Sequence, residues 1–271
     1  VKANSFISTQ LASLAPGSKS IAIHVVPQTG RVNAFVTDER GRGLQALGGD
    51  TVNPVENATK SLVIPAVPQQ TGKKTSLPHT LRILIPGEVG AQIGVEIKST
   101  DGTFSPAGID GKMIPAGKVV DLPLDVIMQS GKFALHLTAD RPFVASVFTK
   151  TQSQGKTDFL WSTGVPELQN GTFATTGLAP LLVFTGDEIS VDLELTSVAG
   201  KKQKFTVRGS DIATYQISER TRSFTVTKRS AQTYGAALIA SKSGFGYAPL
   251  VTGSVLTRTS IPRSNIRVLI P

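Results

Sequence analysis

Three histidines are the residues of this chain best suited to metal binding or proton transfer, and two of them recur in similar segments. His24 lies in IAIHVV and His136 lies in FALHLT, each as the fourth residue of a hydrophobic run. A third similar segment, at 236–253, has the hydrophobic residues Leu238 and Ile239 beside and at the equivalent position. Because neither residue has a ligand atom, the repeated position predicts a packing role in a strand rather than a metal or catalytic site.

Other residues with chemical potential do not converge in the sequence. His79 lies in LPHT, in a predicted linker between structural units. Asp121 and Asp125 are four residues apart in a predicted strand, about 13 Å, which is too far for a glycosidase pair. Ser153 and Lys156 have the Ser-x-x-Lys spacing, but they lie in a polar Gln/Gly loop instead of a helix. The chain has no cysteine, which excludes thiolate metal sites and cysteine catalysis. Because the other candidate groups do not converge, we expect no catalytic residues, no metal site and no cofactor.

Basic residues give the clearest candidate for a binding site. The chain has a formal net charge of +9, and residues 169–271 hold 12 basic and 6 acidic residues. The segment KKQK contributes Lys201, Lys202 and Lys204, and Arg208 follows it. Such a patch attracts anionic partners. The alternative interpretation is a solvated face that keeps the protein soluble.

Two further residues are candidate ligand contacts. Arg141 lies in Asp-Arg-Pro, a predicted turn at whose apex a guanidinium could bind a carboxylate or phosphate. Trp161 is the only tryptophan and could stack on a sugar, although a packing role is also open. Aromatic residues make up 6% of the chain, which disfavours both an aromatic sugar-binding strip and single-stranded nucleic acid binding.

The elements that must position these residues are β-strands. Residues 93–99, 119–126 and 189–196 alternate hydrophobic and polar side chains, the pattern of half-buried strands. Residues 143–150 are β-branched and aromatic, which also favours a strand. Pro-Gly, Asp-Gly and Gly-Lys pairs separate these runs and predict turns. No window of 12 residues has helical spacing of its hydrophobic residues, so we expect little helix.

Internal similarity predicts the domain organisation. Residues 81–102 resemble 181–200, and segments near 61–68 and 159–166 resemble the last seven residues. We therefore predict a partial unit at 1–70 and complete units at 71–168 and 169–271. Because the chain begins VKANS without methionine, we expect a mature or trimmed N-terminus. Because the last unit stops where a repeat should stop, we expect a natural C-terminus.

About seven short strands per 100 residues predict tandem immunoglobulin-like β-sandwiches packed against each other. The alternative architecture is a β-propeller of about five blades, each built from half a unit. The halves of one unit do not resemble each other, whereas whole units do. This favours the sandwiches.

The pattern IPAGKVVDLPL, followed by GKFALHLTADRPFVASVFTKT and DFLW, resembles a repeat in an uncharacterised family of secreted or membrane-anchored actinobacterial proteins of unknown function. Residues 114–124 and 134–147 carry the resemblance, whereas the last unit lacks both the Asp-Arg-Pro and the Pro-Ala-Gly segments. The resemblance implies an extracytoplasmic envelope protein without catalytic activity. It assigns a role to none of the residues.

The sequence therefore predicts a non-enzymatic, extracytoplasmic β-repeat scaffold or binding module of a bacterial cell envelope. Its expected partner is another envelope protein or an anionic wall polymer; nucleic acid is not expected, and any membrane attachment would lie outside this segment. One alternative is a carbohydrate-binding or adhesin-like module that uses the basic last unit. A second is an enzyme with a site at an interface between units.

Overall fold

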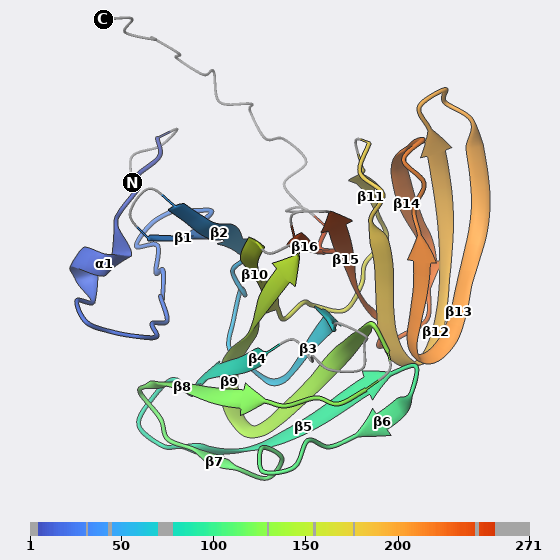
Figure 1. Cartoon of the computed structure of the whole chain (residues 1–271). Helices are drawn as coiled ribbons and strands as arrows, with labels where there is room; N and C mark the ends of the chain where they lie inside the picture. The colour runs from blue at the N-terminus through green and yellow to red at the C-terminus, as the bar shows by residue number, and fades with distance from the viewer. Residues whose placement is uncertain are drawn as a thin grey trace, which may run out of the picture. The chain divides into compact units, whose positions relative to one another are not determined.

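The computed structural model describes residues 5–30, 32–42, 45–69, 78–128, 130–153, 156–175, 177–241 and 244–252. Contacts place residues 34–252 in one compact unit and the residues before them in another. Regular structure in the described residues is almost entirely β (Figure 1). The all-β prediction is confirmed.

The N-terminal unit holds one turn of helix, α1 (Leu11–Leu14). The strand predicted at 21–26 is wrong, because residues 21–27 form no strand in the structure and Ile23, Val25 and Val26 are exposed. A hydrophobic run becomes a strand only where a neighbouring strand binds its backbone groups. Among the described residues, no strand pairs with this run.

Three antiparallel sheets make up residues 34–252. A two-stranded sheet consists of β1 (Val36–Arg42) and β2 (Gln45–Val52). An eight-stranded sheet consists of β3 (Thr59–Pro68), β4 (His79–Leu84), β5 (Ala91–Ser99), β6 (Gly102–Phe104), β7 (Met113–Ile114), β8 (Val119–Leu124), β9 (Lys132–Ser153) and β10 (Lys156–Thr163). A six-stranded sheet consists of β11 (Gly171–Ala174), β12 (Leu181–Ser197), β13 (Lys202–Gln216), β14 (Thr221–Arg229), β15 (Tyr234–Ser241) and β16 (Gly244–Pro249).

The long strand β9 organises the eight-stranded sheet. Its first half pairs with β3 and β5, and its second half pairs with β4 and β10. Residues 140–142 have no partner in the register of these ladders, and the pairing with β3 shifts register there, between Thr138 and Phe143 of β9. The turn predicted at Asp140-Arg141-Pro142 is therefore wrong: the chain continues as a strand, and the proline lies where no ladder needs its missing N–H.

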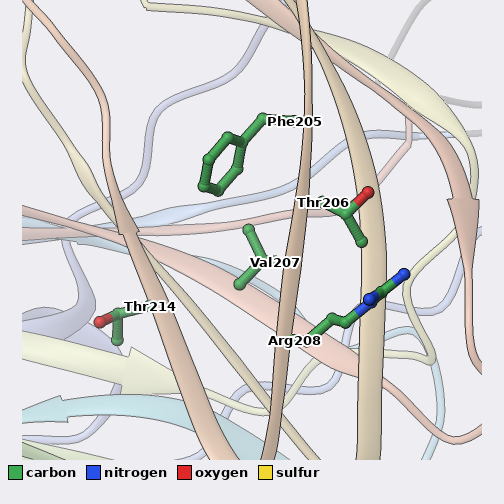
Figure 2. A pocket seen from close by; sticks show the side chains of 5 residues that line it. All are labelled: Phe205, Thr206, Val207, Arg208 and Thr214. Carbon is green, nitrogen blue, oxygen red and sulfur yellow. The ribbon is translucent and has the colours of Figure 1, made fainter.

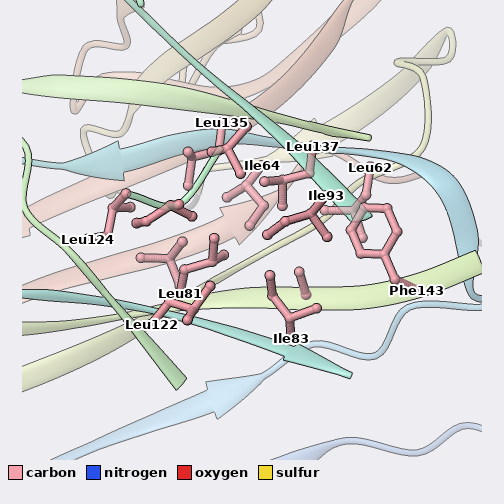
Figure 3. Close-up of a cluster of buried hydrophobic side chains, with 14 of the residues drawn as sticks. Leu62, Ile64, Leu81, Ile83, Ile93, Leu122, Leu124, Leu135, Leu137 and Phe143 are labelled. Atoms are coloured by element: carbon pink, nitrogen blue, oxygen red, sulfur yellow. The ribbon is translucent and has the colours of Figure 1, made fainter. Parts of the chain in front are cut away.

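The core of the eight-stranded sheet is built from alternating positions of its strands. Ile93, Val95 and Ile97 on β5 are at most 2% exposed, whereas Gly94 and Glu96 between them are half-buried. Facing side chains from β3, β4, β8 and β9 complete the cluster (Figure 3). Burying a side chain such as Phe143 contributes roughly 1.5–3 kcal/mol, so this cluster holds the sheet together.

The six-stranded sheet has its own core and shares a second one with its neighbour. Val191 and Leu193 of β12 pack with Phe224 and Val226 of β14. A separate cluster joins the two sheets; its buried members are Ala66, Leu160, Val183, Ile212, Ala236, Leu238 and Tyr247. Tyr247 Oη also donates a hydrogen bond to the carbonyl oxygen of Thr163 at 2.7 Å.

Each large sheet thus curls over its own hydrophobic core, as sandwich-like repeats do. The strands form sheets of eight and six, instead of the successive four-stranded blades of the alternative propeller. The larger sheet uses strands between residues 59 and 163, and the smaller uses strands between 171 and 249. The unit boundaries at 70/71 and 168/169 stay a prediction. Among the described residues, no helix has the length and apolar character to cross a membrane.

Candidate functional site

The predicted basic patch lies on β13, and a tight turn fixes where that strand begins. The Ser197 N–H donates to the Lys201 carbonyl oxygen at 2.9 Å, and the Lys201 N–H donates to Ser197 Oγ at 3.0 Å. Gly200 takes φ 78°, a left-handed conformation that glycine adopts without a steric cost. Lys201 therefore sits in the turn.

From this turn, the register of β13 puts three basic side chains on one face. Lys202, Lys204 and Arg208 are separated by two and four residues, and successive side chains of a strand point to opposite faces. Phe205 and Val207 between them point to the other face, where Val207 joins the core of the six-stranded sheet. The structure thus brings Lys202, Lys204 and Arg208 into one row, which we call the basic row.

Carboxylates of β12 neutralise part of the basic row. Lys202 Nζ lies 2.7 Å from Glu194 Oε1, and the pKa of Glu194 is lowered first by this bond and then by the charges of Lys202 and Lys204. Asp192 Oδ1 accepts a hydrogen bond from Thr206 Oγ1 at 2.7 Å. Within the described part of the chain, Lys204 and Arg208 form no ion pair, so they are the cations best placed to bind a ligand.

A bend in β13 creates a hollow beside the basic row. The pairing of β12 with β13 shifts register between Gly186 and Ile189, and Asp211 on β13 has φ 59°. The strand therefore folds back until the rings of Phe205 and Tyr215 are 4.5 Å apart. The hollow has a volume of about 500 Å³ and is lined by Phe205, Thr206, Val207, Arg208 and Thr214 (Figure 2).

The hollow is lined by apolar side chains and by polar or charged ones, so one ligand can contact both. Figure 2 shows Phe205 and Val207 pointing to one side of the strand and Thr206 and Arg208 to the other. Phe205 is 42% exposed. The arrangement can hold an elongated ligand that carries negative charges and apolar groups, and it offers the guanidinium of Arg208 for a carboxylate or phosphate.

The structure places the two other candidate ligand contacts away from this hollow. Arg141 is exposed in the unpaired stretch of β9, where its neighbour Asp140 accepts a hydrogen bond from the Gln92 N–H at 3.1 Å. Trp161 is 5% exposed and packs against Phe148, with ring centroids 4.9 Å apart. Its ring is covered, which gives it a packing role and not a sugar-stacking face.

The β1–β2 hairpin covers Trp161. The indole Nε1–H donates to Asp38 Oδ2 at 3.0 Å, and the Trp161 backbone N–H donates to Asp50 Oδ2 at 2.6 Å. The Arg40 guanidinium lies 4.4 Å from the centre of the Phe148 ring. Burial raises the pKa of Asp50. Burial also opposes the charge on Asp38, but the bonds from Arg40 and Trp161 outweigh it and lower the pKa of that carboxyl.

His79 is not in a linker, as the sequence suggested, but at the start of β4, with 4% exposure. Its Nδ1 lies 2.9 Å from Thr149 Oγ1, and its Nε2 lies 3.3 Å from Gln69 Oε1. Burial lowers its pKa to about 4. His79 is therefore a neutral, hydrogen-bonded core residue, the same kind of role that we predicted for the repeated histidines.

Sequence reasoning missed a cluster of charged residues where the two large sheets meet. Lys98 Nζ on β5 lies 2.5 Å from Asp187 Oδ1, 3.3 Å from Asp211 Oδ1 and 3.7 Å from Glu96 Oε2. Burial opposes the charge of Lys98, but its bonds to Asp187 and Asp211 outweigh burial and raise the pKa of the ammonium group.

His136 belongs to the same junction. Its Nε2 lies 3.0 Å from Thr185 Oγ1 of β12. Burial, followed by the positive charge of Lys98, lowers its pKa to about 4. Alternation could place Lys98 and His136 in strands, but only the three-dimensional pairing shows that they face the bend of β12 and β13.

Among the described residues, no three histidine, aspartate or glutamate side chains are grouped so that they could hold a metal ion. The carboxylates at the junction of the sheets surround the ammonium group of Lys98, which already balances their charge. A second, polar hollow of about 400 Å³ is lined by Gln169, Asn170, Thr227, Lys228 and Arg229. Arg229 there is bound to Glu167 at 2.7 Å, which leaves Lys228 as the one lining cation without an ion pair among the described residues, whereas the basic row has two, Lys204 and Arg208.

A family model described as "Family of unknown function (DUF5719)" matches residues 1–221 of this chain. A search of curated proteins found no match. Among solved structures, the crystal structure of Thermotoga maritima 1070 is similar to this chain with a TM-score of 0.34 and 16% identity, over 41% of this chain and 96% of that chain.

Proposed function

We propose that this chain, which belongs to the family of unknown function matched over residues 1–221, is a non-enzymatic module that binds an anionic partner on β13. The prediction of an uncharacterised family is confirmed by that match. The actinobacterial source and the location in a cell envelope stay predictions. We include an extracytoplasmic position in the proposal because the sequence resemblance implies it.

One observation carries the proposal: the basic row stands beside the hollow on a strand at the border of its sheet. Lys204 and Arg208 supply positive charge without an ion pair in the described residues, and Lys201 adds a third cation from the turn. An open, shallow surface of this kind suits a polymer or an extended chain better than a small substrate, which needs a concave pocket that encloses it.

The alternative proposal, an enzyme with a site between units, has its strongest support in the junction of Lys98, Asp187 and Asp211. The hydrogen bond and ion pairs there connect one sheet to the other. Such bonds between two sheets favour a structural role, because a catalytic lysine needs a lowered pKa and that of Lys98 is raised. The arrangement therefore favours the binding module.

The proposal is tested by binding to isolated, anionic bacterial wall polymer at two salt concentrations. The variant Lys201→Ala/Lys202→Ala/Lys204→Ala should lose about tenfold or more in affinity and should show a weaker salt dependence, because fewer counter-charges are exchanged. The matched control removes three exposed lysines from other elements, Lys60→Ala/Lys112→Ala/Lys118→Ala. An equal loss in both triple variants would show that net charge alone drives binding and would contradict the proposal.

A further inference from the structure

We propose that the outer edge of β13 accepts an extended, acidic polypeptide as an additional strand of the six-stranded sheet. The inference rests on the proposed function and names the class of partner: a protein segment whose acidic side chains alternate with apolar ones. It follows from the pairing of β13, from the direction of its backbone groups, and from the different chemistry of its two faces.

The edge of β13 is open in the part of the chain that the structure describes. β12 pairs with β13 along its length, and on its other side with β14 and β15. No other described strand pairs with β13, which lies at the border of the sheet (Figure 1). An edge strand presents a row of backbone donors and acceptors on which a further strand can form.

The register identifies which residues present that row. Residues opposite each other in an antiparallel pair alternate between hydrogen-bonded and non-hydrogen-bonded pairs. The Ser197 N–H donates to the Lys201 carbonyl oxygen, so this pair is hydrogen-bonded, and the register continues without a shift from Lys202 to Gly209. The backbone groups of four residues therefore point away from β12: Lys202, Lys204, Thr206 and Arg208.

An independent bond agrees with this assignment. Ser190 stands opposite Arg208 in the register, and its carbonyl oxygen accepts a hydrogen bond from the Ser230 N–H, which lies beyond the end of β14. The backbone of Ser190 thus points away from β13. Its partner in a non-hydrogen-bonded pair, Arg208, points away from β12.

The basic row selects the charge of the added strand. The Cβ atoms of residues directly opposite each other on neighbouring strands are about 4.5–5.5 Å apart. Like charges at such positions are therefore destabilising, and opposite charges are stabilising. A second copy that added its own β13 would bring lysines and arginines against Lys204 and Arg208. An acidic segment places carboxylates there instead.

The other face of β13 selects the residues between the acidic ones. Phe205, Val207 and Thr214 line the hollow on that side, and Phe205 is 42% exposed. An added strand would direct every second side chain toward this hollow. Apolar side chains there would cover Phe205, whereas a uniformly charged polymer leaves it in water.

The probe for this inference is the labelled peptide Glu-Val-Glu-Val-Glu-Val-Glu, blocked at both ends and titrated against the full chain. Thr206→Pro removes one outward N–H and leaves the hydrogen bonds to β12 in place, since proline is tolerated on an edge strand. Thr206→Val is the matched control, because it also loses the bond to Asp192 but keeps the N–H. We expect about a tenfold loss or more for Thr206→Pro and a change under about threefold for Thr206→Val.

A second probe leaves the protein unchanged. The same peptide, N-methylated at alternate residues along one edge, keeps its charges and loses the backbone donors that pair with β13. It should also bind about tenfold more weakly or worse, and this holds whether or not Thr206→Pro folds. Equal binding of the methylated and plain peptides, or of both Thr206 variants, would overturn strand addition.

The outcomes separate this inference from the proposed function. If wall polymer binds and the peptide does not, the anionic module stands and the polypeptide partner is wrong. If neither binds, both are wrong. If the peptide binds with equal affinity after Lys204→Ala/Arg208→Ala, the edge accepts strands without regard to charge, and the acidic partner is wrong.

Discussion

His79 and His136 are held in their neutral form by their surroundings, but the surroundings differ. Burial lowers the pKa of His79, whose neighbours in the described part of the chain include Thr149, Gln69 and the edge-on ring of Phe133. The field of Lys98 acts on His136 in addition to burial. In both cases the folded protein binds a proton only near pH 4, whereas an unfolded histidine binds one near pH 6.5.

These shifts predict acid sensitivity within a defined window. Between pH 6.5 and 4 the unfolded chain binds more protons than the folded chain, so stability is complete above pH 6.5 and falls as the pH approaches 4. His79 alone should contribute on the order of 2–3 kcal/mol to this fall. In His79→Gln, urea unfolding at pH 7.5, 6, 5 and 4 should show a pH dependence smaller by about that amount.

The exposed His24 provides the control for this prediction. His24→Gln should leave the pH dependence as it is in the parent chain. If His79→Gln and the parent lost the same free energy of unfolding between pH 6.5 and 4, His79 would not be the buried neutral residue that the structure shows.

At this scale the sequence indicated the type of role but not the place. From Leu238 in the similar segment we predicted a packing role for the histidine strand. The pairing shows, however, that Leu238 faces Leu181 whereas His136 faces Val63 and Glu96, so the two positions are not structurally equivalent. The partners of His79 are 10 and 70 residues away, and local spacing carries no signal for contacts of that range.

The β1–β2 hairpin shows how an element can be attached mainly through polar side chains. A two-stranded ribbon is marginally stable by itself in water. Here Asp38 and Asp50 accept hydrogen bonds from Trp161, and Arg40 lies over the rings of Phe148 and Phe159. Val52 of the hairpin also packs against this aromatic cluster.

Removing one carboxylate should therefore loosen the hairpin without unfolding the sheets. In Asp50→Ala the backbone N–H of Trp161 loses its acceptor, and water must replace the carboxylate. Because Trp161 is the only tryptophan, its fluorescence reports on this site alone. We expect red-shifted emission and stronger acrylamide quenching, with the far-ultraviolet circular dichroism unchanged.

Glu39→Ala is the matched control on the same hairpin, because Glu39 is exposed. It should leave the emission maximum and the quenching as they are in the parent chain. Unchanged quenching in Asp50→Ala as well would show that the aromatic cluster, and not the carboxylate, holds the hairpin in place.

Period-two patterns predicted individual strands well, because each has one face in a core. Residues 93–99 and 189–196 lie within β5 and β12, and their buried positions alternate as expected except at the end of β5, where Lys98 and Ser99 are also buried. Bends were not predicted: Asp187 and Glu188 look like turn residues, yet they lie at a register shift inside β12. A bend in a continuous strand depends on where its partners change, which is a property of the sheet.

The same limit applies to the candidate site. Spacing alone places Lys202, Lys204 and Arg208 on one face of a strand, and this could be read from the sequence. Whether β13 is a sheet edge depends on which strands occupy the other side of β12. These strands are β14, which begins at Thr221, and β15, which begins at Tyr234. Such long-range pairing leaves no local pattern.

For residues 34–252 as a whole, the two large sheets share structure that neither has alone. The shared cluster takes Leu160 from β10 and Leu238 from β15, and each is at most 6% exposed. Lys98 binds Asp187 and Asp211 across the same junction, and His136 lies within hydrogen-bonding distance of Thr185. Opening the junction would expose the apolar cluster to water and separate Lys98 from its carboxylate partners. We therefore expect the two sheets to unfold together.

This cooperativity can be tested with two variants that should lose a similar free energy of unfolding. Leu238→Ala and Leu124→Ala each remove a buried leucine and should each destabilise the protein by about 2–5 kcal/mol. Leu124 lies in the eight-stranded sheet's own core, whereas Leu238 lies in the shared cluster.

In calorimetry, the parent and Leu124→Ala should show equal calorimetric and van't Hoff enthalpies. Leu238→Ala should show a calorimetric enthalpy that exceeds the van't Hoff value, because the two sheets then unfold separately. A single two-state transition in Leu238→Ala, at the same loss of stability as Leu124→Ala, would mean that the shared cluster does not couple the sheets.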